Sequence, residues 1–342
     1  MKIVNINENS SVAVKEVEEP RIKETDVLIS LNGCGICGTD KENIEGNSSM
    51  SSTKLGHEIC GTIIKRGEKV DKRYSEGMRV FVHHHASCGN CHFCRHGNHT
   101  MCDRYCDDLE PCGMSEKFIL PGWNIEKGSL FPLPDSISDE EGVLIEPLAC
   151  CVRAWKKINR VKNDSCVIFG MGTIGIMHAL LAKNFKFNQI FCIDIKKEKI
   201  DLCEDMNLGY GISSQKEDFE IIKRKMNQGV DLVIIAISNM EVLKQAIELV
   251  RKGGTILIFG QPKKNSFCDI DMSDIYSKEI SIHTTYAASN EDVKESISLI
   301  KDGSLNINKL VTHKFSIDKS VEAFQCAIEN NKAIKVVITG SK

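Results

Sequence analysis

Four cysteines lie close together in one short stretch of this chain, at Cys88, Cys91, Cys94 and Cys102. Two successive Cys-x-x-Cys steps followed by a fourth cysteine are typical of a tetrahedral thiolate site for zinc. Four thiolates fill the coordination shell and leave no position for a substrate, so we expect a structural zinc. A histidine replacing one cysteine, and an iron–sulfur cluster, are the two alternatives for this stretch.

Other histidines and cysteines surround or follow this group. Six histidines crowd the same region: His83, His84, His85, His92, His96 and His99. We interpret most of them as side chains of a solvated polar loop. Further cysteines lie in apolar or helical stretches, where a free thiol packs like a small hydrophobe: Cys150, Cys151, Cys166, Cys192, Cys203 and Cys326.

Three separate patches carry a second set of residues that could do chemistry. Cys37 and Thr39 follow a predicted strand, His57 and Glu58 begin another, and Glu146 precedes the second half of the chain. Cysteine, histidine and glutamate together can hold a zinc ion with an open coordination position, which is what metal catalysis needs. Each patch alone is a weak signal, but their combination with the four-cysteine stretch is informative.

A glycine-rich turn begins at the end of the predicted strand 165–170 and opens a helical pattern. Its residues run Gly170, Met171, Gly172, Thr173, Ile174 and Gly175. Such a turn between a strand and a helix lets the backbone approach a pyrophosphate, which then lies at the helix N-terminus. Asp194 ends the next strand, where an acidic residue binds the ribose hydroxyls of NAD and disfavours the 2′-phosphate of NADP. A flavodoxin-like turn, with Asp194 as a helix cap, is the alternative.

The first 130 or so residues read as rich in β-structure. Short β-branched runs at 27–31, 58–64 and 79–83 predict strands, and residues 130–135, with two prolines, read as a connector.

The remainder alternates strands and helices. Strands are predicted at 165–170, 189–194, 231–237, 255–260 and 279–286, and helices at 173–187, 196–206, 241–251 and 291–301. This alternation predicts βαβ units, a mainly parallel sheet and an α/β fold.

Composition excludes several classes of function. The chain has 342 residues and a formal net charge of −3, with acidic and basic residues interspersed, which argues against a nucleic-acid partner. Its apolar runs are shorter than the roughly 18 residues that cross a bilayer, and residues 1–20 do not read as a signal peptide. We therefore expect no membrane partner and a cytoplasmic location.

On these motifs the sequence resembles the zinc-dependent medium-chain dehydrogenase/reductase family, and within it the sorbitol (polyol) dehydrogenase-like branch. The resemblance implies that Cys37, His57 and an acidic residue, Glu58 or Glu146, hold a catalytic zinc. It implies that Thr39 begins a proton relay. It also implies that the four-cysteine stretch holds a second, structural zinc, and that Cys34 is not a ligand.

Three positions depart from the family pattern. Many relatives have a histidine shortly after the catalytic cysteine, where this chain has Lys41, Glu42 and Asn43; Glu42 is a candidate for the relay. Sorbitol dehydrogenases have an Arg-Tyr pair near the nicotinamide, whereas here Thr285 precedes Tyr286, which leaves Tyr286 as the candidate substrate contact. The usual Pro-Gly-Gly-Phe after the cysteine lobe reads 111–114 Pro-Cys-Gly-Met.

The resemblance implies a GroES-like β-rich catalytic domain at 1–135, joined by 302–342, and a Rossmann domain at 136–301, with the active site between them. It implies two zinc ions per chain, NAD rather than NADP, a small alcohol or polyol substrate and a homodimer or homotetramer. An L-threonine 3-dehydrogenase-like activity and an aldose dehydrogenase are the enzymatic alternatives. A catalytically dead zinc- and nucleotide-binding protein is the non-enzymatic one.

Overall fold

The computed structural model describes residues 1–7, 10–45, 54–106 and 108–340. The chain forms two compact units, one of residues Met1–Ala149 and Ala287–Lys342 and the other of Cys150–Tyr286. The structure thus divides the chain at 149/150 and 286/287 rather than at 135/136 and 301/302. The helix at 290–301 belongs to the first unit because Asn290 at its start bonds to His83 and to Lys127 there.

The second unit is built on a six-stranded sheet in the order β10-β9-β8-β11-β12-β13, in which every neighbouring pair is parallel. Its strands are β8 (Ser165–Phe169), β9 (Gln189–Asp194), β10 (Tyr210–Ser213), β11 (Val230–Ile235), β12 (Val250–Ile258) and β13 (Ser281–Thr284). The order reverses direction between β8 and β11, which makes the carboxyl ends of these strands the usual place for a ligand in a doubly wound sheet.

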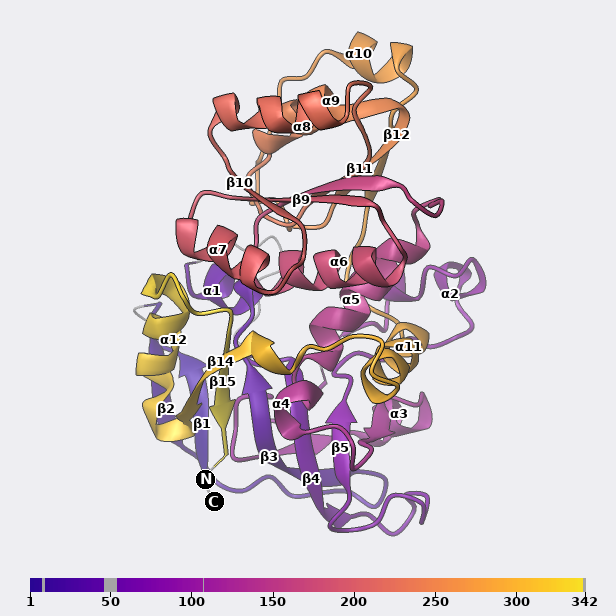
Figure 1. Cartoon of the computed structure of the whole chain (residues 1–342). Helices are drawn as coiled ribbons and strands as arrows, with labels where there is room; N and C mark the ends of the chain where they lie inside the picture. The colour runs from indigo at the N-terminus through magenta and orange to yellow at the C-terminus, as the bar shows by residue number, and fades with distance from the viewer. Residues whose placement is uncertain (8–9, 46–53, 107, 341–342) are drawn as a thin grey trace. The chain divides into compact units, whose positions relative to one another are not determined.

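Helices cover both faces of this sheet, with α6 and α7 on one side and α8 and α9 on the other (Figure 1). Their bounds are α6 (Thr173–Asn184), α7 (Lys197–Asp205), α8 (Glu220–Lys225), α9 (Val242–Leu249) and α10 (Met272–Ser277). The buried strands are almost wholly apolar, as β8 illustrates, because helices on both faces leave no side of a strand in water. This confirms the expected α/β class.

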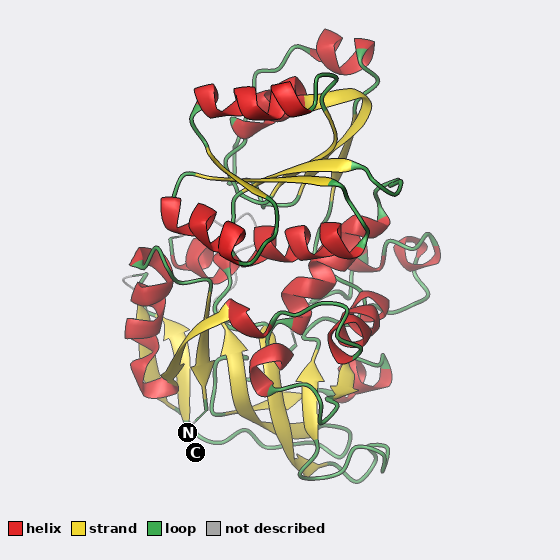
Figure 2. Ribbon diagram, in the orientation of Figure 1, coloured by secondary structure: helices red, strands yellow, loops and turns green. Residues whose placement is uncertain are grey.

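The first unit contains a sheet in the order β14-β15-β3-β4-β5-β7, with β6 pairing to β3, and a separate β1-β2 hairpin (Figure 2). Its strands are β1 (Lys2–Ile6), β2 (Val12–Glu16), β3 (Val27–Gly35), β4 (Glu58–Arg66), β5 (Arg79–Val82), β6 (Lys117–Leu120), β7 (Leu130–Pro132), β14 (Val311–Ser316) and β15 (Lys335–Thr339). The last strand of the chain, β15, pairs antiparallel with β3, so C-terminal residues complete the sheet that N-terminal residues begin.

Short helices connect the strands of this unit. They are α1 (Gly38–Ile44), α2 (His92–Arg95), α3 (Gly122–Glu126), α4 (Asp139–Gly142), α5 (Ile145–Lys156), α11 (Asn290–Lys301) and α12 (Ser320–Glu329). The boundary between the two units falls within α5, and Glu146 lies in its first turn, on the side of the first unit.

The predicted elements agree with the structure in kind and differ at their ends. β9 has its predicted bounds, whereas β3 and β4 extend beyond 31 and 64 because both are central strands with partners on two sides. Residues 130–132, expected as a connector, form strand β7. Among the described residues this strand lies at the end of the sheet beside β5, and an edge strand tolerates the proline at position 132, which has no N–H to donate.

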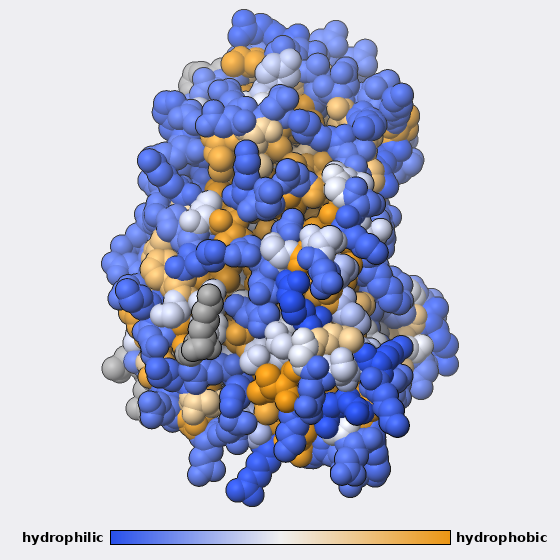
Figure 3. Space-filling view, turned by 60° about the horizontal axis from the view of Figure 1, so that its bottom comes forward, coloured by the Kyte–Doolittle hydropathy of each residue, from blue (hydrophilic) through white to orange (hydrophobic). Residues whose placement is uncertain are grey.

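Hydrophilic residues cover most of the face seen in Figure 3, and hydrophobic residues form smaller groups among them. None of the helices in the described residues is long and apolar enough to cross a membrane.

Candidate active site

The four cysteines of the predicted lobe come together around the short helix α2. The sulfur atoms of Cys88, Cys91, Cys94 and Cys102 all lie within 4.8 Å of one another. Backbone N–H groups point at these sulfurs: the N–H of Cys91 lies 3.3 Å from Cys88 Sγ, and that of Arg104 lies 3.4 Å from Cys102 Sγ. Hydrogen bonds from the backbone of Asn90 and Cys91 lower the pKa of Cys88 to about 6, which favours a thiolate. The arrangement fits a closed four-thiolate metal site.

The sequence predicts a solvated loop for the histidines just before the lobe, but the structure does not place His83 and His84 in one. His83 and His84 are only 1% and 5% exposed, because they continue from the buried end of β5 into the interior. Burial lowers the pKa of both imidazoles. The centroids of the His84 and His57 rings are 5.3 Å apart. The prediction of a solvated loop was therefore wrong for His83 and His84. His92 and His96, in contrast, are exposed.

The second group brings together residues that are distant in sequence. Ligand atoms of Cys37, His57 and Glu58 all lie within 4.8 Å of one another. Cys37 follows β3 and caps α1, whereas His57 and Glu58 stand at the start of β4, which pairs antiparallel with β3. The end of one strand and the beginning of its neighbour therefore meet at one edge of the sheet.

Asp40 contacts two members of this group, a role that the sequence does not predict. Its carboxylate accepts hydrogen bonds from the backbone N–H groups of Cys37 (2.9 Å) and Gly56 (3.3 Å), and it lies 3.7 Å from His57 Nδ1. The carboxylate is almost completely buried, and this burial raises the pKa of Asp40. Burial works to lower the pKa of His57, but Asp40 and Cys37 together raise it well above its usual range.

Lys335 is a second residue that sequence reasoning missed. Its ammonium group donates to both carboxylate oxygens of Glu58, at 2.8 and 2.6 Å, and to the backbone oxygen of Ile36 at 3.2 Å. Glu58 is 1% and Lys335 4% exposed, so this is a buried ion pair between β4 and β15. The two residues are far apart in the chain, and no local pattern in the sequence connects them.

This group fits a zinc ion with an open position. It offers one sulfur, one nitrogen and one carboxylate, the donor types found in catalytic zinc sites. Asp40 adds negative charge, and Glu146 lies close enough for its charge to raise the pKa of His57 and of Lys335. A buried set of anions of this kind favours a bound cation. Cys34 lies outside the group, with its thiol buried in the core.

The glycine-rich turn of the second unit has the geometry that a dinucleotide requires. Gly170 has a φ of +92°, and a Cβ there would lie 2.2 Å from a carbon of Ile237. A Cβ on Gly175 would lie 1.8 Å from the backbone oxygen of Gly170, so only glycine lets α6 pack this closely on β8. At Gly172, in contrast, a Cβ would meet no heavy atom within 4 Å among the described residues other than its chain neighbours. The turn therefore has room for a pyrophosphate.

The helix after this turn and the acid at the end of β9 complete the arrangement. Thr173 and Ile174 form the first turn of α6, whose leading N–H groups have no acceptor within the helix itself. Asp194 accepts a 2.7 Å hydrogen bond from the N–H of Met171, which places its carboxylate beside the glycine turn.

Comparison with known proteins agrees with this geometry. The family profile described as an alcohol dehydrogenase GroES-like domain matches residues 23–135, and that described as a zinc-binding dehydrogenase matches residues 173–302. This chain belongs to the zinc-dependent medium-chain dehydrogenases. Within that family it is sorbitol dehydrogenase-like, and it is an oxidoreductase that acts on CH–OH groups.

The relatives of this dehydrogenase match it over nearly its whole length. Sorbitol dehydrogenase of Bacillus subtilis is 28% identical over 99% of this chain and 97% of that protein. L-threonine 3-dehydrogenase of Chromobacterium violaceum is 26% identical over 94% of each. Among solved structures, that of 2R,3R-butanediol dehydrogenase from Bacillus subtilis superposes with a TM-score of 0.86 at 23% identity, covering 99% of both chains, and shows the same fold.

Two predicted site residues of the dehydrogenase are not members of either group of candidate metal ligands among the described residues. Tyr286 is the last residue of the second unit, after β13, and its contact with substrate stays a prediction. Glu42 lies on α1, and its part in a proton relay also stays a prediction. The hydroxyl of Thr39, by comparison, lies 3.8 Å from Cys37 Sγ, within the metal group.

Proposed function

We propose that this dehydrogenase oxidises a secondary alcohol or polyol to a ketone, with NAD as the hydride acceptor. The observation that carries the proposal is the mixed group of Cys37, His57 and Glu58, which brings three donor types within 4.8 Å of one another. The four-cysteine lobe serves as the structural zinc site. Glu58 is the carboxylate of the catalytic group, and Glu146 is the second acidic residue beside it.

The chemistry follows from the residues around the metal position. When bound, the zinc ion supplies a Lewis acid that lowers the pKa of the substrate hydroxyl. The Thr39 hydroxyl, next to Cys37, takes the proton that leaves this hydroxyl and passes it towards water. The carbinol C–H bond then breaks with its electron pair moving to the nicotinamide. Alcohol and NAD⁺ thus give ketone, NADH and one proton.

The choice of NAD over NADP rests on Asp194. Its carboxylate lies beside the glycine turn, where the ribose of the adenosine half binds in doubly wound folds. A 2′-phosphate there would meet a like charge, whereas two ribose hydroxyls would meet a hydrogen-bond acceptor. We expect Asp194→Ser to reduce the preference for NAD by at least about tenfold in kcat/KM, since close like-charge contacts cost more than 1 kcal/mol.

Polyols are the favoured substrates because sorbitol dehydrogenases are prominent among the relatives and cover nearly all of this chain. L-threonine is the second candidate, since relatives named L-threonine 3-dehydrogenase match with comparable coverage. An aldose remains a variant of the same chemistry. The substrate class is therefore a question for direct assay.

We propose that the enzyme is a homodimer or homotetramer in the cytoplasm. Strand β13 is the last strand in the order of its sheet, and hydrophobic side chains near it are exposed: Ile282, Tyr276 and Phe267. Such an edge favours pairing with a second copy. All sixteen cysteines are free thiols, which suits a reducing compartment.

The test is a panel of substrates with purified, zinc-loaded protein and either NAD or NADP, followed by NADH or NADPH absorbance. The panel contains sorbitol, 2,3-butanediol, L-threonine and an aldose. Turnover of a polyol or simple secondary alcohol with NAD supports the proposal. Turnover of threonine alone would replace it by the second candidate, and the lack of any turnover by protein with both zinc sites filled would contradict it.

A further inference from the structure

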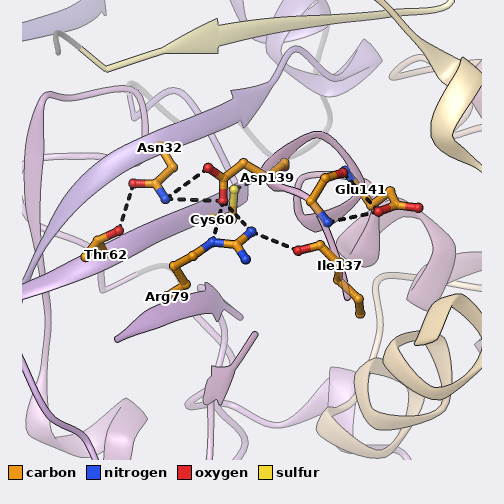
Figure 4. Close-up of polar contacts among 8 residues, drawn as sticks. Asn32, Cys60, Thr62, Arg79, Ile137, Asp139 and Glu141 are labelled. Carbon is orange, nitrogen blue, oxygen red and sulfur yellow. Dashed lines mark hydrogen bonds and ion pairs between the residues drawn. The ribbon is translucent and has the colours of Figure 1, made fainter. Parts of the chain in front are cut away.

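A polar network that contains none of the candidate metal ligands lies at the start of α4 (Figure 4). At its centre, Arg79 of β5 donates to Asp139 Oδ1 through Nε at 3.1 Å and through Nη2 at 2.7 Å. The same Nη2 donates to the backbone oxygen of Ile137 at 2.8 Å. One guanidinium group thus holds both the first residue of the helix and the segment that leads into it.

The network also reaches the two central strands of the sheet. Asn32 of β3 donates to both carboxylate oxygens of Asp139 at 3.2 Å, and its own side-chain oxygen accepts a 3.0 Å bond from Thr62 of β4. The thiol of Cys60, also on β4, lies 3.2 Å from the backbone oxygen of Asp139 (Figure 4). Side chains from three adjacent strands therefore converge on one end of α4.

Close packing adds to these bonds. A Cβ on Gly142, the last residue of α4, would lie 3.0 Å from the Cβ of Cys60. A Cβ on Gly33 would lie 3.1 Å from a methyl group of Val143. The helix and the residue after it are thus pressed against β4 and β3, and they can shift little unless the network at the start of α4 changes.

The connection from α4 to Glu146 is short. Only Val143 and Leu144 separate the two helices, and both are fully buried. The N–H of Val143 donates to the backbone oxygen of Asp139, and the oxygen of Leu144 accepts from Leu148 of α5. The N–H of Leu144 also donates to the backbone oxygen of Glu141, so backbone hydrogen bonds link α4 to the two connecting residues and these to α5, which carries Glu146.

The strands that hold the network also hold the metal group. Cys37 follows β3 and Glu58 begins β4, while Asn32 and Cys60 stand on the same two strands. The sheet therefore supports Cys37, His57 and Glu58 directly, and it supports Glu146 through α4.

We propose that Arg79 and Asp139 are positioning residues that fix the carboxylate of Glu146 relative to the Cys37, His57 and Glu58 group. This inference rests on the proposed function, in which Glu146 is the second acidic residue of the active site. Arg79 is not one of the candidate metal ligands, and it acts on Glu146 through α4 and α5. A displacement of about 1 Å at a reacting centre can lower turnover by up to 100-fold, so the pair affects catalysis from a distance.

The test compares four single variants and one double variant of the full, metal-loaded chain. Arg79→Met removes the network's cation, Glu146→Gln removes the carboxylate, and the double variant removes both. Arg251→Met is a matched control, because it breaks a similar ion pair with Asp231 (2.6 Å) in the second unit. Glu140→Gln is a control on α4 itself, because it breaks the ion pair with Lys314 and leaves the hydrogen bonds between Arg79 and Asp139 in place.

Three quantities are measured: kcat for sorbitol or whichever panel alcohol turns over fastest, the melting temperature, and the visible absorption of cobalt-substituted protein. We expect Arg79→Met to lower kcat on the order of tenfold and to shift the bands of the mixed-ligand site, as Glu146→Gln does. The double variant should be no slower than Glu146→Gln by more than about twofold, since effects that act through one residue do not add. The two controls should lower the melting temperature at most and leave kcat and the bands unchanged.

The outcomes separate the inference from the proposed function. If Arg79→Met changes only the melting temperature, or if its effect multiplies with that of Glu146→Gln, the inference is wrong while the proposed function stands. If Glu146→Gln leaves both kcat and the cobalt bands unchanged, the role of Glu146 in the proposed function is wrong, and the inference fails with it.

Discussion

The two proposed metal-binding groups of this dehydrogenase are built in opposite ways. The lobe takes four identical ligands, Cys88 to Cys102, from a single short loop around α2. The active-site group takes three different ligands from the end of one strand and the start of another, and its charge is balanced by Lys335 from near the end of the chain. The first group needs only its own loop to form, whereas the second needs the whole sheet.

This difference explains their different chemistry. Four thiolates leave no open position, so the lobe can contribute to folding but not to catalysis. The mixed group has two further buried carboxylates beside it, Asp40 and Glu146, and such a site can hold a metal ion with a position free for substrate.

Cys91→Ser should abolish the lobe site. A structural zinc can contribute on the order of 10 kcal/mol to the folding of its own loop, so we expect the lobe to become sensitive to limited proteolysis and the zinc content to fall from two ions per chain to one. Turnover at low temperature should change little, because β3 and β4 still hold the other group. Cys106→Ser, outside the four-cysteine group, is the control; a Cys91→Ser protein that keeps two zinc ions would contradict the contrast.

Cys37→Ser should have the converse effect. We expect kcat/KM to fall at least about 10³-fold, or roughly 4 kcal/mol, because the metal contributes several kcal/mol of charge stabilisation in the transition state. The melting temperature should stay close to that of the wild type. Cys34→Ala is the control, since Cys34 is near in sequence but outside the metal group, and it should retain turnover.

Lys335→Met should show that the active-site group depends on distant residues. In the metal-free protein it leaves the 1%-exposed Glu58 without its cation, and breaking a buried ion pair in this way costs about 3–5 kcal/mol of unfolding free energy. Chemical denaturation measures the loss. The double variant Lys335→Met with Glu58→Gln should recover much of it; equal stability of the single variant and the wild type would argue against the pair's importance.

His178, which belongs to neither metal-binding group, should make the stability of the folded protein depend on pH. His178 is fully buried on α6, accepts a 2.9 Å bond from Trp155 Nε1, and has a pKa lowered by burial to about 3. Between pH 6.5 and 3 the folded state therefore binds fewer protons at this residue than the unfolded chain, so stability falls as the pH falls through this window. From pH 6.5 to 4.5 the loss is about 2 kcal/mol.

His178→Gln keeps an acceptor for Trp155 but does not titrate. Its denaturation midpoint should fall less steeply with acid than that of the wild type, and the remaining slope then belongs to other titrating groups, metal ligands among them. Parallel slopes for the two proteins would show that His178 is not the source.

Local features of the sequence were sufficient for the lobe, the dinucleotide turn and the alternating half of the chain. Three of the four cysteines are separated by only two residues, so they lie close together wherever the loop lies, and Gly175 of the turn is required by the close approach of α6 to β8. The prediction that Cys37 and His57 share one site depended on the family resemblance. The spacing of three distant patches in the sequence does not by itself determine a common site.

The parts that were missed depend on long-range packing. Lys335 meets Glu58 only because β15 pairs with β3 beside β4, and the network around Asp139 joins residues from three strands. His83 and His84 read as polar loop residues, yet the end of β5 carries them into the interior. Polar residues that become buried through tertiary contacts have no local signature in the sequence.

Stepwise removal of zinc by a chelator, with NADH formation followed on the same sample, distinguishes the roles of the two groups. We expect turnover to disappear as the first zinc ion leaves the Cys37, His57 and Glu58 group, while the second ion stays in the lobe and the melting temperature changes little. Full turnover with only the lobe zinc present, or loss of turnover only when the lobe zinc leaves, would contradict this expectation.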